Sequence, residues 1–166
     1  DLGTLYFNES GITGKAFGGL YCCLPDGSSI TAIKRGTLSY NGVGISPDEQ
    51  HVYVSDTFQA RLYRYDLNLE AQEPQYVGTA MGDVAFDSLA VTAAGNICVA
   101  TLLQGGITTF TPTGKATLLS IPDDVSVTNI AFGGEDMRDA YVTLANSGKL
   151  IKMRWEEPGL ALAFNG

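Results

Sequence analysis

Short runs of apolar, β-branched and aromatic residues alternate with polar turns along the whole chain. Four of these runs have the length and composition of β-strands. They are Thr4–Phe7, His51–Ser55, Asn96–Thr101 and Asp139–Thr143. Their equivalent apolar positions, separated by 47, 45 and 43 residues, are Phe7, Val54, Val99 and Val142. Such a period indicates that one supersecondary module is repeated along the chain.

Each module contains the same order of elements: an apolar first strand, a turn rich in Pro, Asp, Gly or Asn, the aligned run, a polar loop and a third strand. A weaker fourth strand follows in most modules. The predicted first strands are 42–46, 88–92 and 130–133. Four antiparallel strands in roughly 45 residues are typical of a propeller blade, whereas no segment repeats apolar residues at helical spacing over three turns. The sequence therefore predicts an all-β propeller.

The length of the chain limits how much of such a ring it can form. Propellers usually close with roughly four to eight blades, and 166 residues at this period make fewer than four complete ones. We therefore expect an incomplete set of about four blades. Residues 1–166 are interpreted as the C-terminal part of a single propeller domain whose N-terminal blades are missing, and we expect this piece alone to be inactive.

Charge and composition narrow the choice of partners. The net charge of −8 has no local cluster of Lys or Arg to offset it, which argues against nucleic acid as a partner. No apolar run is long enough to cross a bilayer, so we expect no membrane partner. Three cysteines, two of them adjacent as Cys22 and Cys23, favour a reducing compartment. The expected location is cytoplasmic, although a signal peptide ahead of residue 1 remains an open alternative.

The repeat brings three polar side chains to matching positions at the start of the first strands. Counting back from the aligned valines by 12 or 13 residues reaches Asn41, Asp87 and Asn129. First strands line the channel of a propeller, so these side chains are expected to converge on its axis. Amide and carboxylate oxygens suit a hard cation. Equally, Asn41-Gly42 has the composition of a hairpin turn, and Asp87 could simply bond nearby backbone N–H groups.

A resemblance to a known family favours the metal interpretation. The segments that carry it follow one another in the order and spacing of successive blade motifs and cover nearly the whole chain. They are Asn41–Asp48, Val52–Thr57, Phe86–Val91, Gly95–Thr101, Asn129–Gly134 and Tyr141–Leu144. In these segments the chain resembles the SMP-30/gluconolactonase/LRE-like family, which includes the regucalcin-like proteins. The resemblance implies a six-bladed propeller with one divalent cation on its axis.

The same resemblance assigns roles to individual residues. It implies that Asn41 and Asp87 bind the cation, with Ca²⁺ expected and Zn²⁺, Mg²⁺ or Mn²⁺ as alternatives, and that Asp87 also takes the proton from an attacking water. Two further ligands of the family, a Glu and an Asn, have no counterpart here and would lie upstream of Asp1. From their positions alone, Glu9 in the loop after the first aligned strand and Asn129 as a channel-lining residue are also expected to contact the substrate. The implied activity is hydrolysis of a small sugar-type lactone to the hydroxy acid.

Other functions can be compared with this one. A serine nucleophile is disfavoured, because no G-x-S-x-G motif occurs and the single histidine, His51, follows an acidic turn and is expected at the surface. A phosphate-binding loop is also disfavoured, because Gly114-Lys115 is followed by Ala116 where that motif requires Ser or Thr. A non-catalytic propeller that binds calcium or a small molecule, and a protein-interaction scaffold, stay open because the fold alone does not decide function. The oligomeric state is not indicated.

Overall fold

The computed structural model describes residues 5–9, 18–37, 39–67 and 73–163, with the side chains of residues 5–9 excepted. Within these residues the chain forms β-strands joined by turns. The strands are β1 (Leu5–Glu9), β2 (Gly18–Cys23), β3 (Ile30–Thr37), β4 (Tyr40–Ile45), β5 (His51–Asp56), β6 (Arg61–Asp66), β7 (Gln75–Gly78), β8 (Ala85–Val91), β9 (Ile97–Leu102), β10 (Gly106–Phe110), β11 (Ala116–Ser120), β12 (Val127–Gly133), β13 (Asp139–Leu144) and β14 (Lys149–Arg154).

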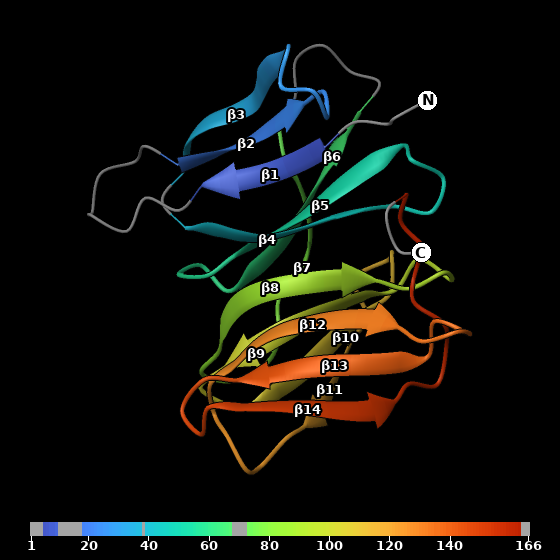
Figure 1. Cartoon of the computed structure of the whole chain (residues 1–166). Coiled ribbons are helices and arrows are strands. Elements are labelled where there is room, and N and C mark those ends of the chain that lie inside the picture. Colours follow the sequence, from blue (N-terminus) through green and yellow to red (C-terminus); the bar gives the residue numbers. More distant parts are fainter. Residues whose placement is uncertain (1–4, 10–17, 38, 68–72, 164–166) are drawn as a thin grey trace.

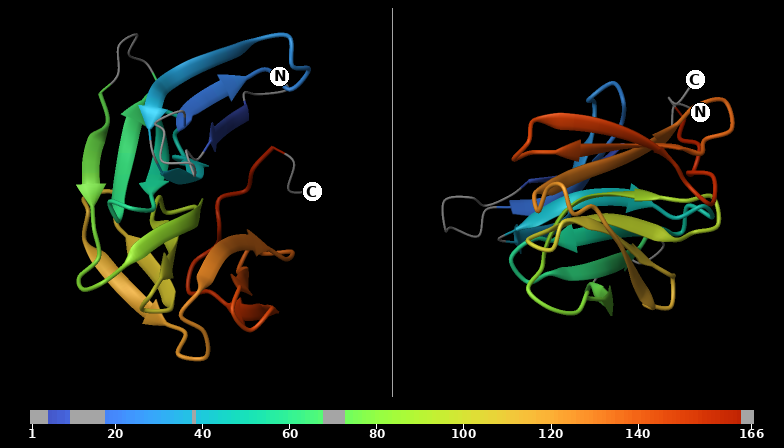
Figure 2. Two further views of the ribbon diagram at one scale, coloured as in Figure 1. Left: turned by 90° about the vertical axis from the view of Figure 1, so that its left-hand side faces the viewer. Right: turned by 90° about the horizontal axis from the view of Figure 1, so that it is seen from below.

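The described strands form four antiparallel sheets, each made of strands that are consecutive in the sequence. We call them blade I (β1–β3), blade II (β4–β7), blade III (β8–β11) and blade IV (β12–β14). Figure 1 shows the blades stacked beside one another, and Figure 2 shows them following an open arc from the blue to the red end of the chain. The expected fold, an incomplete set of about four propeller blades, is confirmed.

Hydrophobic cores lie between successive blades and not inside a single sheet. The second strand of a blade supplies two cores at once, because its successive side chains point to opposite faces. In β5, Val52 and Val54 pack toward blade I, whereas Tyr53 packs toward blade III. This arrangement explains why the aligned runs in the sequence are continuously apolar and do not alternate with polar residues.

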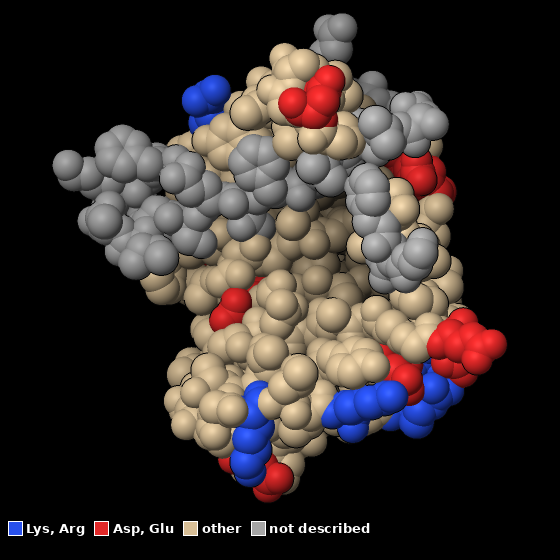
Figure 3. Space-filling view, viewed as in Figure 1, with Lys and Arg blue, Asp and Glu red and all other residues tan. Residues whose placement is uncertain are grey.

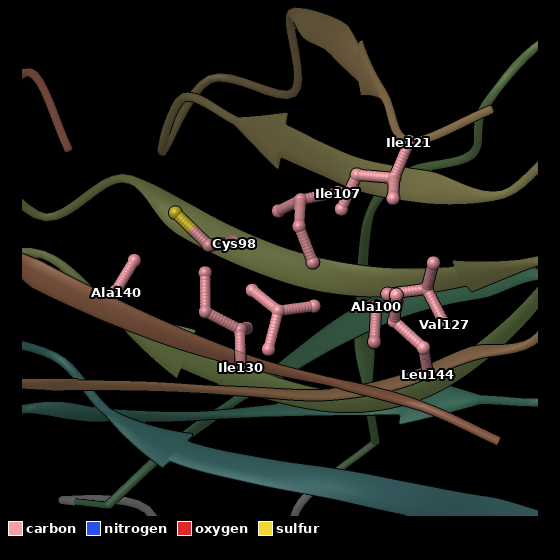
Figure 4. Packing of buried hydrophobic residues seen from close by; sticks show 9 residues of the cluster. Cys98, Ala100, Ile107, Ile121, Val127, Ile130, Ala140 and Leu144 are labelled. Atoms are coloured by element: carbon pink, nitrogen blue, oxygen red, sulfur yellow. The ribbon is translucent and has the colours of Figure 1, made fainter. Parts of the chain in front are cut away.

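The core between blades III and IV is the largest cluster of this kind. Figure 4 shows its aliphatic side chains, with Cys98 and Ala100 of β9 facing Ile130 of β12 and Leu144 of β13. Burial raises the pKa of the Cys98 thiol to about 12, so this residue acts as a small apolar side chain. The cysteines at positions 22, 23 and 98 are all free.

The innermost strands β4, β8 and β12 begin two or three residues earlier than the sequence predicts. In each of them the ladder with the second strand is interrupted by a β-bulge: between Tyr40 and Val43, between Phe86 and Leu89, and between Val127 and Asn129. Because the ladder resumes beyond the bulge, the strand continues upstream of it. The Asn41-Gly42 pair lies in the first of these bulges, so the hairpin-turn alternative is wrong.

The outer strands of blades III and IV carry exposed side chains and ion pairs. Each residue of β11 is exposed, and on β14 Arg154 lies 2.6 Å from Asp136 and 2.7 Å from Asp139. Figure 3 shows basic and acidic side chains mixed over the lower part of the molecule, where β14 lies. Exposed pairs of this kind contribute little to stability. Among the described residues, no helix is long and apolar enough to span a membrane.

Candidate metal centre on the inner strands

Asn41 and Asp87 meet where the inner strands of blades II and III run side by side. Their side chains are both half-buried, and the Asn41 side chain hydrogen-bonds the Asp87 carboxylate. Asn41 Nδ2 also donates to Thr57 Oγ1 at 3.2 Å. An amide and a carboxylate predicted from the repeat are therefore brought together by two consecutive blades.

Glycine allows the two inner strands to approach so closely. A Cβ atom on Gly42 would lie 2.7 Å from the Leu89 backbone N and 2.9 Å from the Ser88 backbone C. A Cβ atom is essentially never found so close to a backbone atom it is not bonded to, so only glycine fits here. The close approach places the residue before Gly42, Asn41, next to the residue before Ser88, Asp87.

Burial changes the acidity of the central carboxylate. The pKa of Asp87 is raised above its usual value, chiefly because burial disfavours the charged form; hydrogen bonds from the Ser88 backbone and the Asn41 side chain oppose the rise. A carboxylate with a raised pKa is a better proton acceptor than a solvated one. The same group gains more from a cation placed beside it, because less water competes for its charge.

The Ser55 side chain connects the inner strands β4 and β8 through hydrogen bonds to their backbones. This fully buried residue of β5 accepts a hydrogen bond from Gly42 N at 2.7 Å and donates one to Asp87 O at 2.5 Å. Sequence reasoning missed Ser55, because a serine inside an apolar strand looks like an ordinary β-sheet residue.

Asn129 lies one position away from the expected register. Val43, Leu89 and Ile130 pair with the aligned valines, so the residue equivalent to Asn41 and Asp87 is Thr128. The shift arises because the β12–β13 ladder extends one residue pair farther toward its turn than the β4–β5 and β8–β9 ladders do. Thr128 Oγ1 lies 2.8 Å from Thr143 Oγ1 in its own blade, whereas Asn129 is exposed.

Two other residues singled out in the sequence lie away from this pair. The backbone of Glu9 ends β1, and its side chain is outside the described residues. His51 begins β5 next to the end of β4, and its ring lies 4.0 Å from Asp48 with a quarter of the side chain exposed. It is therefore remote from Asn41, which lies near the other end of β4.

The donor set at the pair suits a hard cation but is small. Asn41 and Asp87 offer an amide and a carboxylate, the ligand types that Ca²⁺ and Mg²⁺ prefer. No group of three or more His, Cys, Asp or Glu side chains that could hold a metal occurs in the described part of the chain. Asn41 and Asp87 therefore have the chemistry to serve as two of the ligands of a divalent cation.

An open depression lies at the same end of the inner strands. It is lined by Asp83, Val84, Leu103 and Gln104 and has a volume of about 720 Å³. Asp83 and Val84 directly precede β8, which carries Asp87, and Gln104 Nε2 donates to Met81 O at 2.8 Å. Leu103 adopts a left-handed backbone with φ of 74°, a conformation that is found disproportionately at functional sites. These loop residues carried no sequence signal.

The sequence of this chain is similar to a known protein family and to curated relatives named as lactonases. The model of the SMP-30/gluconolactonase/LRE-like region matches residues 2–146. Lactonase drp35 of Staphylococcus saprophyticus is 30% identical over 119 residues, which are 68% of this chain and 37% of the relative. Pentonolactonase XacC of Haloferax volcanii is 27% identical over 133 residues, which are 77% of this chain and 45% of the relative.

A solved structure agrees with the fold. The X-ray structure of a protein assigned to the gluconolactonases superposes with a TM-score of 0.79 at 26% identity, covering 97% of this chain and 58% of that one. The chain spans less than half the length of the two curated relatives. The match over residues 2–146, the blade architecture and the relatives named as lactonases together show that this chain belongs to the SMP-30/gluconolactonase/LRE-like family.

Proposed function

We propose that the protein carrying this chain hydrolyses a small sugar-type lactone to its hydroxy acid with the help of a divalent cation. The observation that carries the proposal is the contact between Asn41 and Asp87 on neighbouring inner strands. The relative named as a pentonolactonase supports a sugar-type substrate. The relatives named as lactonases support cleavage of a lactone ester.

Asn41 and Asp87 would hold the cation. Their oxygens suit Ca²⁺, which is the expected ion, with Mg²⁺, Mn²⁺ and an oxygen-liganded Zn²⁺ as alternatives. A cation bound there would polarise the lactone carbonyl and lower the pKa of a bound water. Asn41 contributes a neutral oxygen, and its bond to Thr57 restricts how the amide can rotate.

Asp87 has a second role as the group that accepts the proton of the attacking water. Its raised pKa makes it a stronger base than an exposed aspartate, and its half-buried position leaves one side open to a substrate. Glu9 and Asn129 remain proposed substrate contacts. Asn129 is exposed on the inner strand of the next blade, which leaves its amide free to reach a bound ligand.

The test is lactone hydrolysis by the whole protein, with and without a chelator. We expect chelation to abolish turnover, and Asp87→Ala to lower kcat/KM at least about 100-fold, as removal of a metal ligand and base requires. Asp123→Ala is the matched control, because Asp123 is exposed in the loop between β11 and β12. Activity that survives both chelation and Asp87→Ala would overturn the proposal. Retained cation binding without turnover would point instead to a binding propeller.

A further inference from the structure

Ser55 makes an unusual pair of bonds for a buried strand residue. Its hydroxyl accepts from Gly42 N of β4 and donates to Asp87 O of β8, so one atom joins the inner strands of two blades. The two backbone groups both lie in β-bulges, where the regular ladder is interrupted. A buried backbone group without a partner is unfavourable, and the Ser55 hydroxyl supplies a partner to both of these groups.

The equivalent positions in the next two blades do not form such a bridge. Register places Ala100 of blade III and Thr143 of blade IV where Ser55 stands in blade II. Ala100 has no hydroxyl, and the Thr143 hydroxyl bonds Thr128 inside its own sheet. Among blades II to IV, the hydroxyl bridge therefore occurs only between the two strands that carry Asn41 and Asp87.

We propose that Ser55 is a positioning residue that keeps Asn41 and Asp87 side by side for a cation. This inference rests on the proposed function. Gly42 directly follows Asn41, and the bridged carbonyl belongs to Asp87 itself, so any movement at Ser55 is transmitted to both ligands. Partners that orient metal ligands typically change metal affinity by roughly 10–100-fold when they are removed.

The experiment measures Ca²⁺ and Mn²⁺ affinity of the whole protein by calorimetry in Ser55→Ala, Ser55→Thr and the wild type. We expect Ser55→Ala to weaken binding by about 10–100-fold. Ser55→Thr retains the hydroxyl, and a threonine is accommodated at the equivalent position of blade IV, so it should restore most of the affinity. Thr143→Ala is the matched control, because it removes an equivalent hydroxyl bond away from the pair, and its affinity should equal that of the wild type.

A second readout does not need the cation. The Gly42 amide donates to Ser55, so its hydrogen exchange, followed by NMR, should become about three- to tenfold faster in Ser55→Ala, the effect of one lost hydrogen bond. Thermal unfolding of each variant shows that binding is measured on folded protein.

The outcomes separate this inference from the proposed function. Unchanged affinity and unchanged Gly42 exchange in Ser55→Ala would overturn the positioning role, as would an equal loss of affinity in Thr143→Ala. Should Asp87→Ala bind the cation as tightly as the wild type, the proposed function would fall. In that case the Gly42 exchange rate still decides whether Ser55 holds the two strands.

Discussion

The chemistry of the candidate centre depends on a half-buried carboxylate whose pKa, within the described part of the chain, is shifted by burial and two hydrogen bonds and not by a basic side chain. Burial raises the pKa of Asp87, and the hydrogen bonds from the Ser88 backbone and the Asn41 side chain only partly oppose this. The charged form is therefore less stable in the folded protein than in the unfolded chain. A carboxylate kept in this state gains from a cation and loses stability without one.

The raised pKa of Asp87 predicts how the stability of the cation-free protein changes with pH. Because the pKa of Asp87 is higher in the folded state, the folded state binds more protons between the two pKa values, and the free energy of unfolding falls as the pH rises through them. We expect Asp87→Asn to raise the melting temperature of the cation-free protein at neutral pH, with the gain disappearing toward acid pH. Thermal melts from pH 3 to pH 8 measure this, and Asp123→Asn is the control. A lower melting temperature for Asp87→Asn at neutral pH would contradict the account.

Counting residues along the repeat found equivalent positions of the inner strands where the hairpins of the blades were similar in length. Asn41 and Asp87 were identified because their distances to the aligned valines follow the hairpin lengths of blades II and III. The same counting reached Asn129 in place of Thr128, because the paired hairpin of blade IV is longer. Ser55 and the loop residues around Leu103 could not be predicted, since their contacts join different blades.

At the scale of elements, the close packing of β4 against β8 determines the spacing of the two candidate ligands. A Cβ on Gly42 would lie 2.7 Å from Leu89 N and 2.8 Å from Ser55 Oγ. Two backbones and a buried hydroxyl cannot all move aside without separating the blades. The geometry of the centre is therefore coupled to the packing of the inner strands.

We expect Gly42→Ala to lower the free energy of unfolding by about 1–3 kcal/mol, the usual cost of overpacking. Gly133→Ala is the matched control, because Gly133 also lies in an inner strand and its added Cβ would meet only the Tyr141 ring at 3.4 Å. Urea denaturation of both variants measures the difference. Equal stability of the two variants would show that the close approach of β4 and β8 is not required.

The cores between blades are expected to contribute far more to stability than the exposed outer strands. Phe110 is fully buried and packs edge-on against Phe86 with ring centroids 5.7 Å apart. We expect Phe110→Ala to cost about 3–5 kcal/mol. Leu118→Ala on the exposed strand β11 should change stability by about 0.5 kcal/mol or less. Chemical denaturation distinguishes the two, and a large loss at Leu118 would mean that the outer strand is covered by something outside the described residues.

For the molecule as a whole, the period of the sequence was enough to predict the blades. Runs such as 52–54 are apolar at every position because their two faces pack into two cores, and this continuous burial made them easy to align. The extent of the inner strands was not predictable, since bulges at polar residues look like turns in a sequence. The family assignment agrees with the predicted motifs over most of the chain.

The central claim at this scale is that the axis of the propeller holds a cation between two blades. It is tested most directly by a crystal structure of the whole protein grown with Ca²⁺, with anomalous scattering used to locate the ion. The account predicts one ion within about 2.3–2.6 Å of an Asn41 oxygen and an Asp87 oxygen. An ion bound elsewhere, or Asn41 and Asp87 turned away from each other around an empty axis, would contradict it.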